Sequence, residues 1–268
     1  MAKLQDLFTQ ARRTLGGSSM GFVSKSRSES KAHAAALVVE FPHVADGQAA
    51  GVLEAALKAG ADGLLLSWDG QEGATLENLK SEIDSAKAGK DQLVTGLRIT
   101  GGWDKLDRES LAHIKEKGIQ YIILPLDAPA RLLALEEKDL EKVVTVPMRT
   151  GEMYPLFIRN LTAFENISAV LLDFELGAHI GSMSIEDMLQ YRAVREAVRF
   201  PAFFNIHKQL SEEDAYTITT LGVQAVILQA AATEETMRKQ VKALRTLLEK
   251  IHKEKEEQDK DSSPLLKQ

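Results

Sequence analysis

The stretch AAGVLEAALKAGADGLLLSW, residues 49–68, carries a helix signal and a strand signal in succession. In its first half, apolar residues recur every three or four positions, as an amphipathic helix requires, at Ala49, Val52, Leu53, Ala56 and Leu57. Gly60 follows this pattern, and glycine commonly ends helices because it adopts the left-handed conformation without strain. The run GLLLSW, residues 63–68, lacks in–out alternation, which is typical of a strand covered on both faces. We therefore predict one helix followed by one buried strand.

Seven further runs of this kind lie along the chain, which makes eight with GLLLSW. They begin at residues 36, 93, 120, 142, 168, 201 and 224, with the sequences ALVVEF, LVTGLRI, QYIILPL, KVVTVPM, SAVLLDF, PAFFNI and QAVILQA. Successive runs start about 27 residues apart, which is the length of one strand, one helix and two short loops. Ser184, Ser211 and Thr233 each precede a helical pattern and supply the hydroxyl of an N-terminal cap.

Eight strand–helix units in about 220 residues predict an α/β fold, a single-domain (β/α)8 TIM barrel. The alternative is an open, doubly wound sheet, but open sheets of this kind more often contain about five to seven strands. We expect an N-terminal helix and a Gly/Ser-rich linker over residues 1–35, the barrel over residues 36–252, and a charged flexible tail over residues 253–268. The apolar residues of the N-terminal helix are compatible with a homodimer interface.

Composition excludes several classes of function. The 268 residues include no cysteine, which removes disulfides, thiolate zinc sites, iron–sulfur clusters and cysteine nucleophiles. A formal net charge of −6 gives no electrostatic reason to expect nucleic acid as a partner. No apolar run approaches the roughly 20 residues that span a bilayer, so we expect no membrane association and a cytoplasmic location.

In a barrel of this type, function lies where the strands end at their carboxyl side. Polar residues adjoin the apolar runs there and form the candidate site: Glu40, Arg98, Arg149, Asp173, Asn205 and Gln229, with His207 in the loop that follows the seventh strand. Because only alternate residues of a strand point into a barrel, we expect roughly half of the first six to face the helices.

The chemistry of these side chains limits their roles. Arg98 and Arg149 can bind a carboxylate or a phosphate through parallel hydrogen bonds, with Asn205 and Gln229 completing a substrate site. Glu40, Asp173 and His207 are the candidates for moving protons. No HxH or HExxH spacing predicts a zinc site, and no cofactor is firmly implied. Two carboxylates at i and i+2, Asp173 and Glu175, are compatible with Mg²⁺.

Two segments resemble the ribulose-phosphate-binding class of barrels, which contains indole-glycerol-phosphate synthase. They are ALKAGADGLLLSW, residues 56–68, and FPAFFNIHKQLSEEDAYTITTLGVQAVILQA, residues 200–230. The resemblance implies a barrel with a phosphate site in glycine-bearing loops after strands seven and eight. Here those loops read NIHKQLS and LQAAATEE without glycine, which leaves the arginines as the predicted anion site.

A further stretch, AVLLDFELGAHIGSMSIEDM at residues 169–188, is similar to the corresponding part of pyruvate-class metal-dependent aldolases of the HpcH type. This resemblance implies that Asp173 helps to hold Mg²⁺ and that Arg98 binds the carboxylate of the substrate. The glutamate expected at the end of the fifth strand is replaced in VPMRTGEM by Met148 or Arg149.

The sequence therefore predicts a lyase or isomerase that acts by acid/base chemistry on a small anionic metabolite bearing a carboxylate or phosphate. The alternative is a catalytically degenerate barrel that serves as a ligand-binding or protein-interaction module.

Overall fold

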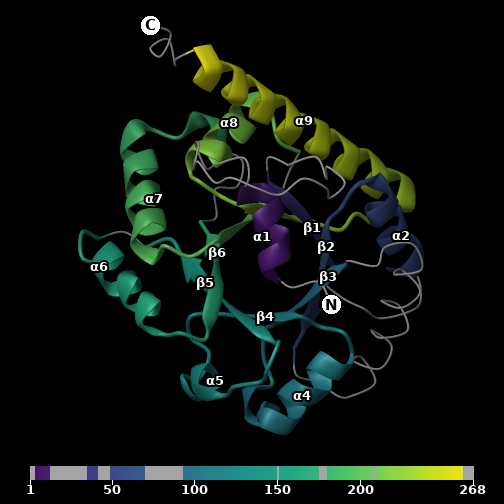
Figure 1. Ribbon diagram of the computed structural model, residues 1–268, viewed down its shortest axis with the longest axis vertical. Helices are drawn as coiled ribbons and strands as arrows, with labels where there is room; N and C mark the ends of the chain where they lie inside the picture. The colour runs from purple at the N-terminus through teal and green to yellow at the C-terminus, as the bar shows by residue number, and fades with distance from the viewer. Residues whose placement is uncertain are drawn as a thin grey trace, which may run out of the picture.

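The chain forms a closed barrel of eight parallel strands, seen end-on in Figure 1. The computed structural model describes residues 4–12, 35–41, 49–69, 93–149, 151–174, 180–206 and 209–261. Neighbouring strands pair in sequence order, and β8 pairs with β1 to close the ring. The strands are β1 (Ala36–Phe41), β2 (Gly63–Trp68), β3 (Val94–Ile99), β4 (Tyr121–Leu124), β5 (Glu141–Pro147), β6 (Ile167–Asp173), β7 (Ala202–Ile206) and β8 (Ala225–Gln229). The predicted TIM barrel is confirmed.

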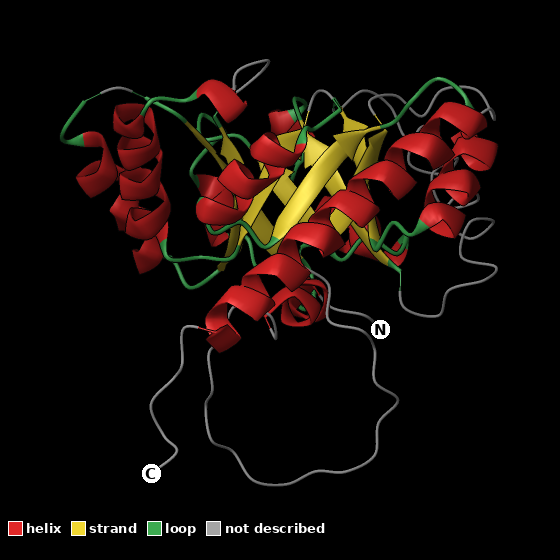
Figure 2. Ribbon diagram, turned by 90° about the horizontal axis from the view of Figure 1, so that it is seen from above, coloured by secondary structure: helices red, strands yellow, loops and turns green. Residues whose placement is uncertain are grey.

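Helices surround the ring of strands, as Figures 1 and 2 show. The described α-helices are α1 (Leu4–Arg12), α2 (Ala49–Ala59), α4 (Arg108–Glu116), α5 (Arg131–Ala134), α6 (Tyr154–Ile158), α7 (Ile185–Val198), α8 (Glu212–Thr220) and α9 (Glu234–Asp261). Short 3-10 turns are η1 (Trp103–Lys105), η2 (Arg159–Ala163) and η3 (Ile180–Ser182). Helix α9 reaches Asp261 and so enters the segment from residue 253 where the sequence predicts a tail. The helix predicted after β2 lies outside the described residues.

Local sequence signals predict accurately where the strands and helices begin. Each strand begins within one residue of its predicted start. Ser184 caps α7 in a reciprocal capping box with Asp187. Ser211 does the same for α8, where its hydroxyl accepts from Asp214 N at 3.1 Å and Asp214 accepts from Ser211 N at 2.9 Å. Asp214 also accepts from Gly181 N at 2.7 Å, which ties the connection after β6 to α8.

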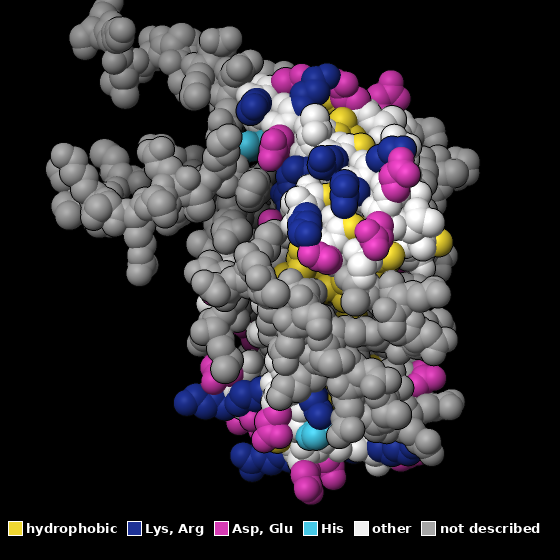
Figure 3. Space-filling model, turned by 90° about the vertical axis from the view of Figure 1, so that its right-hand side faces the viewer, with side chains coloured by type: hydrophobic (Ala, Val, Ile, Leu, Met, Phe, Trp, Pro, Cys, Tyr) yellow, Lys and Arg dark blue, Asp and Glu magenta, His cyan; other side chains and the backbone are white. Residues whose placement is uncertain are grey.

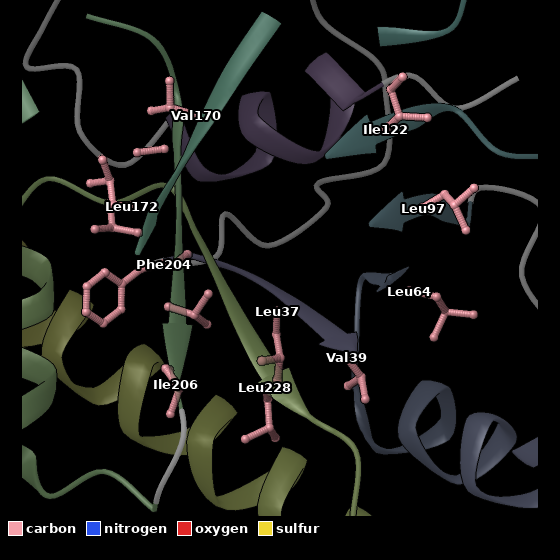
Figure 4. Close-up of a cluster of buried hydrophobic side chains, with 14 of the residues drawn as sticks. Leu37, Val39, Leu64, Leu97, Ile122, Val170, Leu172, Phe204, Ile206 and Leu228 are labelled. Carbon is pink, nitrogen blue, oxygen red and sulfur yellow. The ribbon is translucent and has the colours of Figure 1, made fainter. Parts of the chain in front are cut away.

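The outward faces of the strands form the larger core, packed against the surrounding helices. Figure 4 shows part of this core, in which strand residues such as Leu37, Leu64, Leu97 and Phe204 extend from the outer face of the barrel. These side chains are nearly inaccessible to solvent, which explains why the runs read as continuously apolar.

A second, smaller core fills the inside of the barrel, and α1 closes one end of it. Leu4, Leu7 and Phe8 are buried in this inner core. The ring of Phe8 meets the ring of Phe203 edge-on with centroids 5.0 Å apart. Figure 1 shows α1 at the centre of the ring, and contacts with β1 and β8 hold it there. The barrel therefore covers Leu4, Leu7 and Phe8, which are among the apolar residues considered for a homodimer interface.

A buried arginine connects α9 to β1 and to the turn before β2. Arg245 donates to the carbonyl oxygens of Ala35 at 3.2 Å and Gly60 at 2.7 Å, and it forms an ion pair with Asp62. Asp62 in turn accepts from Leu37 N at 2.8 Å. This network joins the end of the chain to β1 and to the turn before β2.

The described surface is mixed in charge. On the face shown in Figure 3, basic and acidic side chains lie beside one another. Exposed ion pairs fit this distribution, such as Lys239 with Glu235 within α9 and Lys250 of α9 with Glu212 of α8. No described helix combines the length and the apolar character needed to cross a membrane.

Candidate functional site

Five of the six polar residues predicted at the strand ends face the inside of the barrel. Glu40, Arg98, Asp173, Asn205 and Gln229 each lie an even number of residues after an inner-core residue of the same strand. The expectation that half of the six would face the helices is therefore wrong. The sixth, Arg149, follows the end of β5 and is exposed.

An ion pair between Glu40 and Arg98 crosses the mouth of the barrel. Arg98 Nη2 donates to Glu40 Oε2 at 3.0 Å, and Arg98 Nε lies 2.8 Å from Glu40 Oε1. The second contact lacks the alignment of a hydrogen bond, so the buried Nε–H has no hydrogen-bond partner. The two side chains are only 14% and 20% exposed, which places the pair in surroundings where charges interact more strongly than on the surface.

Neighbouring strands hold this pair in place. Ser67 of β2 donates its hydroxyl to Glu40 Oε1 at 3.1 Å, and Asn205 Oδ1 of β7 accepts from Arg98 Nη2 at 3.2 Å. Among the described residues, nothing accepts a hydrogen bond from the other terminal nitrogen, Nη1 of Arg98. Arg98 therefore keeps one donor that could bind a ligand.

A cavity of about 170 Å³ opens at the ion pair. Its described lining consists of Glu40, Arg98, Asn205, Ile206, Ile227 and Gln229. Four of the residues predicted from the sequence thus come together from β1, β3, β7 and β8. The volume is below the roughly 300–1,000 Å³ typical of ligand sites, so this cavity can hold only a small group.

Asp173 and Arg149 are not part of this described lining. Asp173 is half-buried at the end of β6, and its carboxylate makes no hydrogen bond or ion pair with a described residue. Burial raises the pKa of Tyr154 at the start of α6, and the charge of Arg149 partly opposes that shift. Tyr154 donates to Pro147 O at 2.5 Å. The arginine pair predicted to bind one anion together does not share this cavity.

The predicted catalytic and binding residues do not include Ser67 or Tyr121, although Ser67 lies at the predicted end of the second strand. Ser67 follows the inner-core residue Leu65 by two positions, so strict alternation along β2 was the available signal. Tyr121 lies in the inner core, where its ring stacks on Phe203 with centroids 5.6 Å apart. Burial holds its pKa far above the ordinary value; the charge of Glu40 adds to this shift and that of Arg98 opposes it.

The loop after β8 differs from an anion-binding loop. Ala230 N donates to the carbonyl oxygen of Glu40 at 2.7 Å, and Ala231 N donates to Met237 Sδ at 3.4 Å. These two N–H groups already have partners within the chain, and neither residue is a glycine. They cannot hold a phosphate in the way that backbone N–H groups of glycine loops do.

Some predicted residues cannot be placed. His207 and Glu175 lie outside the described residues. Within the part of the chain that is described, no three His, Asp or Glu side chains are grouped so that they could hold a metal ion. Mg²⁺ therefore stays a prediction from the sequence, with Asp173 as its one described candidate ligand.

No protein-family model matches the chain, and a search of curated proteins gives no significant match. Solved structures do match. Tryptophan synthase from M. tuberculosis superposes with a TM-score of 0.63 and 13% identity over 93% of this chain and 100% of that chain. The alpha subunit of tryptophan synthase from Legionella pneumophila gives 0.60 and 12%, covering 80% of this chain and 93% of that chain. A mutant alpha subunit from Pyrococcus furiosus gives 0.61 and 12%, covering 79% and 98%.

Identities this low establish the fold alone. Together with the closed ring of eight parallel strands, the comparisons show that the chain is a TIM barrel.

Proposed function

We propose that the protein is a lyase or isomerase that binds a small anionic metabolite at the Glu40–Arg98 cavity and acts on it by acid/base chemistry. One observation carries this proposal: Glu40, Arg98, Asn205 and Gln229, from four separate strands, line one cavity at the carboxyl end of the barrel. Convergence of polar side chains on one hollow at this end is the arrangement of active sites in barrel enzymes.

Arg98 is the anchor for the anion in this proposal. Its Nη1 has no partner among the described residues, so this nitrogen can donate to a ligand. A carboxylate can accept two parallel hydrogen bonds from a guanidinium, whereas Glu40 now accepts one. The amides of Asn205 and Gln229 supply further donors to an oxygen-rich ligand. A carboxylate fits the small cavity better than a phosphate held by backbone N–H groups.

Glu40 is the proposed base. A ligand carboxylate that binds Arg98 competes with Glu40 for the same guanidinium and so frees the Glu40 carboxylate. Glu40 then takes a proton from the carbon next to a carbonyl, and the electron pair moves onto the carbonyl oxygen. Return of the proton to another atom gives an isomerase, and breakage of the next bond gives a lyase. Asp173 and His207 are the proposed partners for returning the proton.

Matched substitutions test the anchor. The wild type, Arg98→Gln and Arg149→Gln are compared by thermal shift and calorimetry against a panel of 2-oxo acids and phosphorylated sugars. We expect at least one 2-oxo acid to stabilise the wild type, Arg98→Gln to abolish that binding, and Arg149→Gln to leave it nearly unchanged, because Arg149 does not line the cavity. If no anion stabilises the wild type, the proposal fails.

A second experiment tests the base. Exchange of the ligand's carbon-bound proton is followed by NMR in D2O for the wild type and Glu40→Gln. We expect exchange with the wild type only, while Glu40→Gln still binds the ligand.

The alternative is a barrel that binds a ligand without turnover. The Glu40–Arg98 contact favours it, because each charge is already compensated by the other and both side chains are mostly buried. Binding through Arg98 without any proton exchange in the wild type would select this alternative.

A further inference from the structure

A larger pocket lies between α9 and the ends of β7 and β8. Its volume is about 370 Å³, within the range of small-molecule sites. One helical stripe of α9 forms one wall, with Gln240, Ala243, Leu244 and Leu247. The ends of the two strands and the residues that follow them form the other wall, with Ile206, Gln209, Leu210, Leu228, Gln229, Ala230 and Ala231.

The chemistry of this pocket differs from that of the Glu40–Arg98 cavity. Its described lining contains no charged side chain. Most of the surface comes from leucine, isoleucine and alanine, with three glutamines as the polar groups. A mainly apolar hollow with a few neutral hydrogen-bonding groups suits an aliphatic or aromatic group and disfavours a charged one.

The two hollows adjoin each other. Ile206 and Gln229 line both the pocket at α9 and the cavity at the ion pair. These residues end β7 and β8, so the rim of the barrel at these strands is the boundary between a charged compartment and an apolar one. Together the two compartments exceed the roughly 300 Å³ at the lower limit of ordinary ligand sites, which the cavity alone does not reach.

We infer that one ligand occupies both compartments, with its anionic group at Arg98 and an apolar group of several carbons in the pocket against α9. The inference rests on the proposed function and narrows it. It makes the substrate class an organic acid with an aliphatic or aromatic body, rather than a phosphorylated sugar. Gln229, at the junction, is the residue that contacts the middle of such a ligand.

A homologous series of straight-chain carboxylates, from acetate to octanoate, is the probe. Dissociation constants are measured for each acid by NMR titration or calorimetry with the full-length protein. Burial of each additional methylene is expected to strengthen binding about threefold to fourfold, until the chain fills the pocket. Binding of every member is expected to require Arg98, so Arg98→Gln removes it throughout the series.

Ala243→Phe tests the location of the apolar group. Ala243 is exposed on α9 and lines the pocket, so a phenyl ring there fills the space without disturbing a buried position. We expect this variant to lose the gain with chain length while its affinity for acetate stays within about twofold of the wild type. Thr246→Phe is the matched control, because Thr246 is exposed on α9 and does not line the pocket. Ala231→Phe, on the opposite wall, repeats the test from another element.

The outcomes separate the two proposals. Failure of every acid to bind the wild type overturns the proposed function. Binding through Arg98 with no dependence on chain length overturns only the present inference. A dependence on chain length that survives in both Ala243→Phe and Ala231→Phe also overturns it, because the apolar group must then lie elsewhere.

Discussion

At the scale of single residues, the hydroxyl of Tyr121 in the inner core lacks a hydrogen-bond partner within the described part of the chain. Tyr121 Oη is fully buried and has no hydrogen-bond partner among the described residues. A buried hydroxyl in this state has lost its hydrogen bonds to water without replacement. We therefore expect Tyr121→Phe to raise the free energy of unfolding by about 1 kcal/mol in chemical denaturation. A loss of stability would instead indicate that an ordered water bonds the hydroxyl.

Gly96 makes room for the same ring. A Cβ at Gly96 would come within 2.1 Å of the Tyr121 ring. We expect Gly96→Ala to lower the free energy of unfolding by about 2 kcal/mol, the usual cost of overpacking a core. The loss should shrink in a Tyr121→Leu background, measured by the same denaturation. Equal losses in both backgrounds would show that the close approach is not the cause.

The Glu40–Arg98 ion pair is also open to a direct measurement. A double-mutant cycle with Glu40→Gln and Arg98→Gln should give a coupling free energy of about 1–3 kcal/mol, because each single change leaves a mostly buried charge without its partner. The exposed pair of Lys58 and Glu54 on α2 is the control, and solvent should reduce its coupling strongly. Comparable coupling in the two pairs would contradict the view that burial strengthens the interaction at the mouth.

At the scale of elements, α1 contributes to stability because it closes one end of the barrel and packs on the inner core. Phe8 is 3% exposed and packs on Phe203 of β7. Phe8→Ala should lower the free energy of unfolding by about 3 kcal/mol, since it removes a buried ring and leaves a cavity. Gln5→Ala, at an exposed position of the same helix, should change it by less than about 0.5 kcal/mol. A small effect at Phe8 would mean that α1 is dispensable for the inner core.

The elements themselves were largely predictable. The strands were located within one residue because both of their faces are covered, and such strands read as unbroken apolar runs. Ser184 and Ser211 marked helix starts because capping is a local interaction. The place of α1 was not predictable, because an amphipathic helix shows only that one face is covered. The residue types at Leu4, Leu7 and Phe8 do not indicate that the inside of the barrel is the surface that buries them.

The sequence predicts which residues lie at the mouth of the barrel, but it does not predict which of them contact one another. Position at a strand end identified Glu40, Arg98, Asn205 and Gln229 as mouth residues. Which of them meet depends on the tilt and closure of the whole ring, and Glu40 and Arg98 are 58 residues apart in the chain. Arg149 also follows an apolar strand run in the sequence. It does not line the cavity, because the geometry of the closed ring decides which strand ends meet there.

At the scale of the whole molecule, most of the large apolar side chains that the described residues expose belong to two helices in contact, α6 and α7. Met153, Leu156 and Phe157 at α6 and Ile185 and Leu189 of α7 are between 52% and 82% exposed. The two helices pack against each other and lie side by side in Figure 1. Together these side chains expose an apolar area on the order of 500 Å².

We expect this α6–α7 face to pair with the same face of a second copy. With its polar rim added, one such face approaches the roughly 800 Å² that each partner buries in a standard protein interface. Sedimentation velocity of the wild type should show a concentration-dependent dimer, and Leu189→Glu should shift it to monomer. Glu249→Gln on α9 is the control with no expected effect. A wild type that stays monomeric at all concentrations contradicts this prediction.

The position of α1 also has a consequence for the order in which the protein is made. This helix precedes all eight strands in the sequence and is therefore synthesised before them, yet it rests on β1, β7 and β8. The surface on which α1 packs is incomplete until β8 has been synthesised and has paired with β1. Until then Leu4, Leu7 and Phe8 lack their native contacts. They remain exposed apolar surface of the kind that chaperones recognise. The helix that is synthesised before the strands is therefore buried only after the last of them has formed.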